Sequence, residues 1–175
     1  MDAMRPLATL IEADGSWTLR FERRLDHPID KVWRAVIEPA HRDMWFPQRI
    51  VGDLEPGARL RFVDDPNLPA EGFEGRCLAV DPPRLLELQW GEDRLRIELE
   101  ADGDGTRFVL LEALAERRHA ARSGAGWHLC LERFHAALDG GPPPPETDEA
   151  IWNEVHGAYL DAVGGDRHVW GQEPD

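Results

Sequence analysis

Two histidines and a glutamate are spaced so that one helix would bring them together. His128, Glu132 and His135 stand at positions i, i+4 and i+7, which share one side of an α-helix. Imidazole nitrogens and carboxylate oxygens are both zinc ligands, and His119 could complete such a site. The same spacing is typical of an exposed row of ion-pairing side chains. We favour the second interpretation and expect no metal and no other cofactor.

Arg23 interrupts an apolar strand face. It follows Leu19 and Phe21 at alternating positions, so the three side chains share one face of an extended segment. Either Arg23 reaches solvent at the end of the strand, or it points inward and holds an anionic group of a ligand. We favour the solvent-exposed position.

Glu112 raises the same question on a later strand, where it shares a face with Phe108 and Leu110. If Glu112 and Arg23 both point inward, we expect them to pair, because a lone buried charge is costly. An apolar environment would raise the pKa of the Glu112 carboxyl, which makes Glu112 the weak candidate for a catalytic acid or base. His27, at a strand end, is a weaker candidate.

Three tryptophans, Trp45, Trp90 and Trp127, are spread along the chain. We favour their assignment to the core. The alternative is that they line a binding cavity, where aromatic walls suit planar or apolar ligands.

Motifs that would indicate catalysis are missing from the sequence. It contains no G-x-S-x-G, no phosphate-binding glycine loop and no H-E-x-x-H, and Gly103-Asp104-Gly105 is typical of a turn. No nucleophile stands beside a base. We therefore lean against an enzyme.

The elements that must position these residues follow from hydrophobic periodicity. Alternation of apolar and polar residues predicts strands, and Asp102-Gly103-Asp104-Gly105 is a strong hairpin signal. The predicted strands cover residues 17–25, 58–62, 71–81, 86–90, 95–99 and 108–114. From the second strand onward they are expected to form an antiparallel meander.

Helical periodicity appears in separate segments. Apolar spacing predicts short helices at about 29–36 and 40–45, a long helix at about 127–138 and a last helix at about 148–163. Thr147 or Asp148 would cap the last one. Residues 116–126 are expected to form a charged loop, residues 142–145 a stiff extended spacer, and the tail beyond Gly165 a frayed end.

Composition narrows the partners and the compartment. The chain has 175 residues and a net charge of −14, so nucleic acid and anionic membrane surfaces are unfavourable partners. No apolar run is long enough to span a membrane and no secretory signal is present, so we expect a cytoplasmic protein. All but one of the 20 basic residues are arginines, which suits a bacterial genome rich in G and C. Cys77 and Cys130 are expected to be buried reduced thiols.

Several ordered motifs resemble one family. They are Pro28-Ile29-Asp30-Lys31-Val32-Trp33-Arg34-Ala35-Val36, Glu38-Pro39, Met44-Trp45-Phe46-Pro47, Leu54-Glu55-Pro56-Gly57-Ala58, the run Gly75–Leu85 followed by Trp90, Gly105-Thr106-Arg107 and Gly126-Trp127. The segment from about Trp17 to Leu138 thereby resembles the START-like (SRPBCC, helix-grip) superfamily, and within it the activator of heat-shock protein 90 ATPase homologue-like family.

The resemblance implies an α+β helix-grip fold, with a curved antiparallel sheet wrapped around a long C-terminal helix. Residues 1–140 would form this domain, and residues 141–175 a proline-rich spacer and an additional helix packed on the domain or on a partner. Members of the superfamily bind hydrophobic molecules between sheet and helix. The expected ligand-binding residues are Trp45, Phe62, Phe73, Trp90, Phe108, Leu110, Trp127 and Leu131.

Three functions follow as expectations. The first is noncatalytic binding or carriage of a small hydrophobic or aromatic molecule. The second is a polyketide cyclase-like or dehydratase-like enzyme that uses the same cavity. The third is a protein-interaction module or homodimer, in which Trp152 and Tyr159 of the last helix would dock on the partner.

Overall fold

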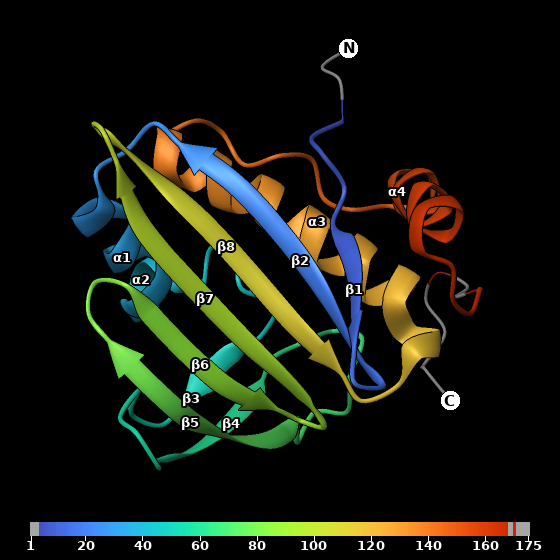
Figure 1. The fold of residues 1–175 in the computed structure, drawn as a ribbon, viewed down its shortest axis with the longest axis horizontal. Helices are drawn as coiled ribbons and strands as arrows, with labels where there is room; N and C mark the ends of the chain where they lie inside the picture. The colour runs from blue at the N-terminus through green and yellow to red at the C-terminus, as the bar shows by residue number, and fades with distance from the viewer. Residues whose placement is uncertain (1–3, 168–169, 171–175) are drawn as a thin grey trace.

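An eight-stranded antiparallel sheet forms one layer of the computed structural model, which describes residues 4–167 and 170 (Figure 1). The strand order is β1-β2-β8-β7-β6-β5-β4-β3. The strands β3 to β8 thus form a meander in sequence order, and β8, the last of them, pairs with β2. The strands are β1 (Thr9–Ala13), β2 (Ser16–Leu25), β3 (Arg49–Val51), β4 (Arg59–Val63), β5 (Phe73–Asp81), β6 (Leu85–Trp90), β7 (Asp93–Asp102) and β8 (Gly105–Leu114).

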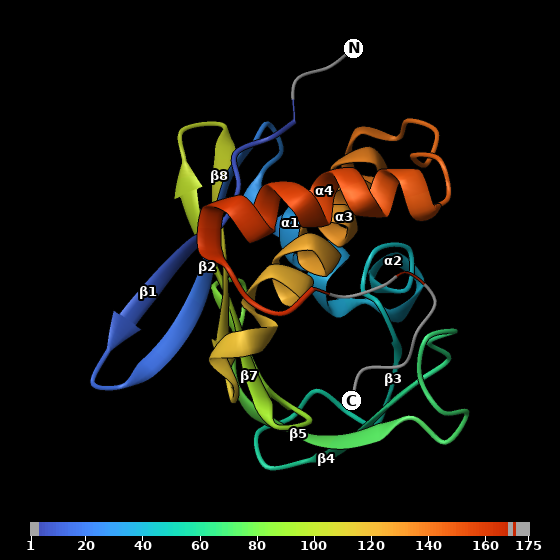
Figure 2. The same cartoon turned by 90° about the vertical axis from the view of Figure 1, so that its right-hand side faces the viewer.

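The helices form the second layer. They are α1 (Ile29–Ile37), α2 (Pro39–Arg42), the 3₁₀ turn η1 (Arg117–His119), α3 (Ala120–Asp139) and α4 (Glu149–Val163). Figure 2 shows the sheet curving around α3, with α4 on the far side of α3 from β4 and β5. None of the helices in the described ranges is both long enough and apolar enough to cross a bilayer.

Apolar side chains from both layers fill the space between sheet and helix. Leu19, Phe21 and Leu25 of β2 are each no more than 2% exposed, and so are Phe108 and Leu110 of β8. The two strands pair in register, with Phe21 opposite Leu110. The predicted alternation and the α+β architecture are therefore confirmed.

Two edge segments were not predicted as strands. β1 has four exposed residues out of five, and β3 has only three residues. A strand that is solvated on both faces, or that is very short, carries no period-2 signal. The second short helix was also predicted too long, because α2 ends at Arg42 and residues 43–45 form a turn.

The long helix begins seven residues earlier than predicted, at Ala120 instead of Trp127. The segment 116–126 is therefore largely helical, and the prediction of a loop there was wrong. Its glycines suggested a break, but Gly124 has a packing role. A Cβ at Gly124 would lie 2.4 Å from Cδ1 of the Tyr159 ring, so only glycine lets α4 approach α3 this closely.

We expect Gly124→Ala to destabilise the protein by about 1–2 kcal/mol, because the buried Tyr159 ring must shift. Gly126→Ala is the matched control, since a Cβ there would meet no atom within 4 Å. Alanine is the better helix former by about 1 kcal/mol, so Gly126→Ala should be neutral or stabilising. Urea unfolding of both variants measures the difference. Equal effects would contradict the α3–α4 packing.

The last helix packs on its own chain. Asp148 caps it as predicted, accepting a hydrogen bond from the Ile151 amide at 2.9 Å. The Tyr159 hydroxyl accepts a hydrogen bond from the Ala8 amide at 3.1 Å and contacts α3 through His128. Trp152 is 8% exposed and Tyr159 is 0% exposed. The expectation that these two side chains dock on a partner was therefore wrong, because the fold of this chain already buries them.

Two smaller expectations concern the cysteines and the chain ends. Cys77 and Cys130 are free and buried, as expected. Residues 142–145 contain no helix or strand, and Gly140 ends α3 in the left-handed conformation with φ 68°. The frayed tail predicted beyond Gly165 falls in part outside the described residues.

Candidate functional site

Five aromatic rings form a closed circuit between α3 and the strands β4 to β6. The contacts run from Phe46 to Phe62, Phe73, Trp90 and Trp127 and back to Phe46, with ring centroids 5.0–6.3 Å apart. These distances are typical of favourable aromatic pairs. We call these five residues the aromatic cluster.

The sequence identified most of this cluster. Phe62, Phe73, Trp90 and Trp127 were all predicted to line a ligand site, and the fold brings them together. The other predicted residues continue into the core. Trp45 contacts Phe46 and Phe134, Phe108 contacts Phe134, and Leu110 and Leu131 are fully buried.

Sequence reasoning missed two residues here: Phe46, a member of the aromatic cluster, and Gln48, which is hydrogen-bonded to it. Phe46 lies in the turn after α2, where no periodicity marks it as buried, yet it is only 6% exposed. Gln48 accepts a hydrogen bond from the Trp90 indole at 2.9 Å and donates one to Asp65 at 2.7 Å. No sequence signal could have linked Gln48 to a tryptophan 42 residues away.

The aromatic cluster reaches the surface on one side. Phe62 and Trp127 are buried, whereas Phe73 and Trp90 are half-buried. The two half-buried rings come from the facing ends of β5 and β6, which pair with Gly75 opposite Trp90. A Cβ at Gly75 would lie 2.6 Å from the Phe62 ring, so glycine here leaves room for that ring.

Glu112 is buried beside the aromatic cluster. It lies on the inner face of β8 opposite Leu95 and Leu19, is 0% exposed, and neither carboxyl oxygen has a hydrogen-bond partner of normal geometry. Burial, and after it the neighbouring Asp93 carboxylate, raises the pKa of Glu112 well above its ordinary value of 4.5. The Ser123 and Trp127 side chains oppose this shift but do not outweigh it. Burial thus favours the neutral form of the Glu112 carboxyl over the charged form.

Arg23 also points inward, and the expectation that it reaches solvent was wrong. It is 5% exposed and lies close enough to α3 for its charge to act on His128 and His135. Arg23 does not pair with Glu112 either, since Arg23 lies opposite Phe108 and Glu112 opposite Leu19, four positions further along both strands. The two inward-pointing side chains are thus too far apart along the strands to meet.

The histidines of α3 are not the exposed row that we favoured. His128 is 2% exposed and His135 is 9% exposed, because α4 and the segment before β1 cover this side of α3. The His128 ring lies 3.1 Å from the Tyr159 hydroxyl, and Glu132 pairs with Arg5 at 3.1 Å. No cluster of three or more metal-ligating side chains occurs among residues 4–167 and 170.

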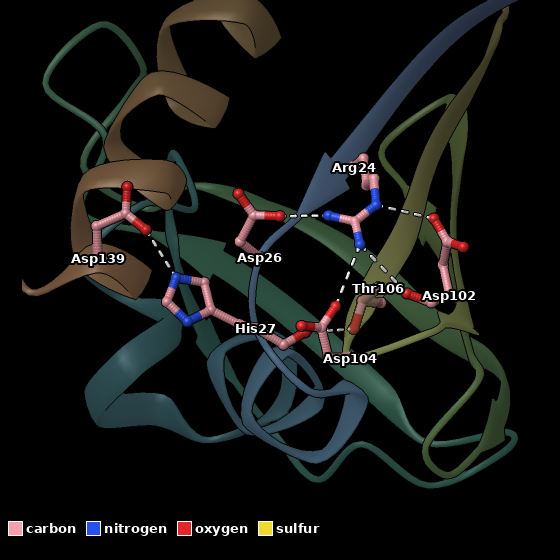
Figure 3. Close-up of polar contacts among 7 residues, drawn as sticks. All are labelled: Arg24, Asp26, His27, Asp102, Asp104, Thr106 and Asp139. Atoms are coloured by element: carbon pink, nitrogen blue, oxygen red, sulfur yellow. Dashed lines mark hydrogen bonds and ion pairs between the residues drawn. The ribbon is translucent and has the colours of Figure 1, made fainter.

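His27 has a structural environment at the end of α3 (Figure 3). Its Nε2 atom lies 2.7 Å from Asp139, and its Nδ1 atom lies 3.1 Å from Nζ of Lys31. Lys31 also donates a hydrogen bond to the Leu138 carbonyl at 2.7 Å. These contacts connect α1 to the C-terminal end of α3, where the helix dipole favours a cation. His27 therefore has a structural role here, linking the start of α1 to the end of α3.

A separate groove of about 410 Å³ lies over β3, β4 and β5, lined by Leu60, Gly75 and the exposed arginines Arg59, Arg61 and Arg76. None of the predicted ligand-binding residues lines it. The groove is therefore distinct from the aromatic cluster.

A curved antiparallel sheet that holds one long helix, with two short helices after the first long strand, defines a helix-grip domain. The chain belongs to the family described as Activator of Hsp90 ATPase homolog 1-like protein, whose model matches residues 26–139. No curated protein matches the chain.

Solved structures share this fold over nearly the whole chain. The crystal structure of CalU16 from Micromonospora echinospora is 24% identical, with a TM-score of 0.71 over 89% of this chain and 95% of CalU16. A conserved protein of unknown function from Enterococcus faecalis is 21% identical, with a TM-score of 0.71 over 88% of each chain. The BPP1335 protein of Bordetella parapertussis is 26% identical, with a TM-score of 0.65 over 94% of this chain and 92% of that protein.

Proposed function

We propose that the protein binds a small hydrophobic molecule, preferably an aromatic one, at the aromatic cluster without transforming it. The observation that carries this proposal is the closed circuit of five rings with two half-buried members, Phe73 and Trp90. Aromatic rings that only fill a core would be buried on all sides, whereas Phe73 and Trp90 are partly exposed to solvent. Here the circuit extends from the buried Trp127 to the surface at β5 and β6.

The chemistry of the cluster favours a planar apolar ligand. Aromatic side chains bury a large area with few rotatable bonds, so stacking on them costs little conformational entropy. The nearest polar groups are few: the Gln48 amide bonded to Trp90, and the Glu112 carboxyl near Trp127. A site with many apolar walls and a small number of polar groups is typical of small-molecule binding.

The test uses N-phenyl-1-naphthylamine, a neutral aromatic dye whose fluorescence rises in an apolar site. We expect saturable binding to the wild-type protein, and a Kd about three to ten times higher for Trp90→Ala, which removes the ring that pairs with both Phe73 and Trp127. Trp17→Ala is the matched control, because Trp17 is also half-buried but stacks under Arg117 at 5.0 Å and contacts no ring of the cluster.

Two results would contradict the proposal. One is absence of saturable dye binding, and the other is an equal loss in the Trp90 and Trp17 variants. Native mass spectrometry of the freshly purified protein complements the dye, since a co-purified organic molecule would identify the ligand class and the same spectrum reports whether the chain forms a homodimer.

A second candidate function is favoured by Glu112. A buried carboxyl with a raised pKa beside an aromatic site could serve as general acid for a cyclisation or dehydration, as in a polyketide cyclase-like enzyme. Glu112→Gln separates the two functions, because a noncatalytic binder keeps its dye affinity and has no turnover to lose. An enzyme would keep binding and lose turnover of its substrate, and unchanged turnover in this variant would exclude the role.

A further inference from the structure

Arg23 has an unpaired donor edge in the interior of the protein. Its side chain is 95% buried, with 5% of its surface exposed. Nη1 donates a hydrogen bond to the Glu22 carbonyl at 2.9 Å, but Nε and Nη2 have no hydrogen-bond partner. A buried cation with unsatisfied donors is unfavourable, so this position calls for an acceptor.

The two unpaired atoms form the edge of the guanidinium that binds carboxylates. The Nε–H and Nη2–H bonds are parallel and lie on one side of the planar group. Together they match the two oxygens of a carboxylate, which gives a bidentate pair. The hydrogen bond already made by Nη1 fixes the orientation of the group and leaves this edge available.

The charged side chains around Arg23 favour a bound ligand that carries one negative charge. Arg23 and Arg5 are cations, and the neighbouring carboxylate is Glu132. Its Oε2 atom accepts a hydrogen bond from Nε of Arg5 at 3.3 Å, whereas its buried Oε1 atom lies 3.1 Å from the same nitrogen without hydrogen-bond geometry. His128 and His135 lie close enough for the Arg23 charge to act on them. Both are neutral at pH 7, because burial, with the arginine charges, lowers the pKa of each to about 4. Arg23, Arg5 and Glu132 together therefore carry a surplus of one positive charge. Asp139, which also acts on His135, lies 2.7 Å from His27 and pairs with it.

This polar cluster lies on a different side of α3 from the aromatic cluster. His128 meets Tyr159 of α4, and Glu132 pairs with Arg5 of the segment before β1. The charge of Arg23 on β2 acts on both His128 and His135. Trp127 instead contacts Phe46 and Trp90. On β2 and β8 the neighbours of Arg23 are apolar: Phe21 and Leu25 flank it on the same face, and Phe108 lies opposite.

We propose that the Nε–Nη2 edge of Arg23 binds the carboxylate of a small organic monoacid at a second site between β2 and the α4-facing side of α3. The single surplus charge suits a monoanion, and the apolar flanks suit a short hydrocarbon or aromatic group on it. The unpaired Nε2 atom of His135 provides one further polar contact at this site.

The test measures thermal unfolding of the full chain at pH 7 in sodium benzoate or acetate against sodium chloride and sulfate at equal ionic strength. We expect a carboxylate to raise the unfolding midpoint by about 3 °C. Arg23→Met should abolish this shift, and it should fold, because replacing an unpaired buried charge by an apolar residue of similar size is often neutral or stabilising. Arg24→Met is the control, since Arg24 lies on the outer face of β2 with Asp102 and Asp104.

A second measurement observes the site directly. The side-chain Nε–H signal of Arg23 in a proton–nitrogen NMR spectrum should shift on addition of benzoate and should be the signal lost in Arg23→Met. Equal stabilisation by chloride or sulfate, or a shift that persists in Arg23→Met, would overturn the proposal. So would carboxylate binding that occurs only in Glu132→Gln, because Glu132 would then be the acceptor for Arg23 within the chain.

Discussion

Replacing Glu112 with glutamine is expected to stabilise the protein at pH 8 and to leave its stability nearly unchanged at pH 4. The carboxyl is 0% exposed and neither oxygen has a hydrogen-bond partner of normal geometry, so the charged form is unfavourable in the folded state. Burial, and after it Asp93, raises the pKa of Glu112 well above 4.5. Glutamine has the same shape and carries no charge at any pH.

The sign follows from proton linkage. Below pH 4.5 the carboxyl is protonated in both the folded and the unfolded state, and Glu112 imposes no penalty. As the pH rises above 4.5, the unfolded chain loses this proton while the folded chain retains it. The wild type then loses about 1.4 kcal/mol of unfolding free energy per pH unit until the folded pKa is reached. The variant avoids this loss.

Urea unfolding of wild type and Glu112→Gln at several pH values between 4 and 8 measures the effect. Glu92→Gln is the control, because Glu92 is exposed in the turn between β6 and β7. The control should change little at every pH. If Glu112→Gln destabilised the protein by the same amount across the range, the carboxyl would have to be a charged, well-partnered group in the folded state.

The second large effect is acid destabilisation through the two buried histidines of α3. Burial is the main reason why the pKa of both His128 and His135 falls from 6.5 to about 4, with the charges of Arg23 and Arg5 acting in the same direction. Above pH 6.5 both rings are neutral in both states. As the pH falls from 6.5 towards 4, the two rings become protonated in the unfolded chain but stay neutral in the folded chain. Each histidine therefore lowers the unfolding free energy by about 1.4 kcal/mol per pH unit.

The double variant His128→Asn with His135→Gln should lose most of this acid sensitivity. Asparagine places a polar atom near the position of Nδ1, which lies 3.1 Å from the Tyr159 hydroxyl. His41→Gln is the control, since the His41 side chain is 56% exposed and pairs with Glu38. The readout is the slope of unfolding free energy against pH between 4 and 6.5. An unchanged slope in the double variant would show that other groups cause the acid sensitivity.

The two effects act in opposite directions, which gives a further check. Between pH 4.5 and 6.5 the two histidines raise stability with pH and Glu112 lowers it, and above pH 6.5 only the effect of Glu112 continues. These three groups alone place the maximum of stability near pH 6.5. In Glu112→Gln the decline above that pH should be smaller.

Local patterns determined much of the fold. The alternation along β2, β7 and β8, the helical spacing in α1 and the cap at Asp148 depend on residues within one segment, so the sequence was sufficient to predict them. The ordered family motifs added the helix-grip architecture, and with it most of the aromatic cluster. In each case the physical cause is short-range: side-chain periodicity, turn chemistry or a cap.

Only the tertiary structure determined which polar side chains are buried and which partners they have. The alternation on β2 places Arg23 on the face of Phe21, but it does not reveal that α3 covers this position at the strand end. The same holds for His128 of α3, which lies against Tyr159, 31 residues later in sequence. Tyr159 in turn is bonded to Ala8, 151 residues away. Whether a polar side chain meets water, a partner or neither depends on which distant segment packs against it, and no local period contains that information.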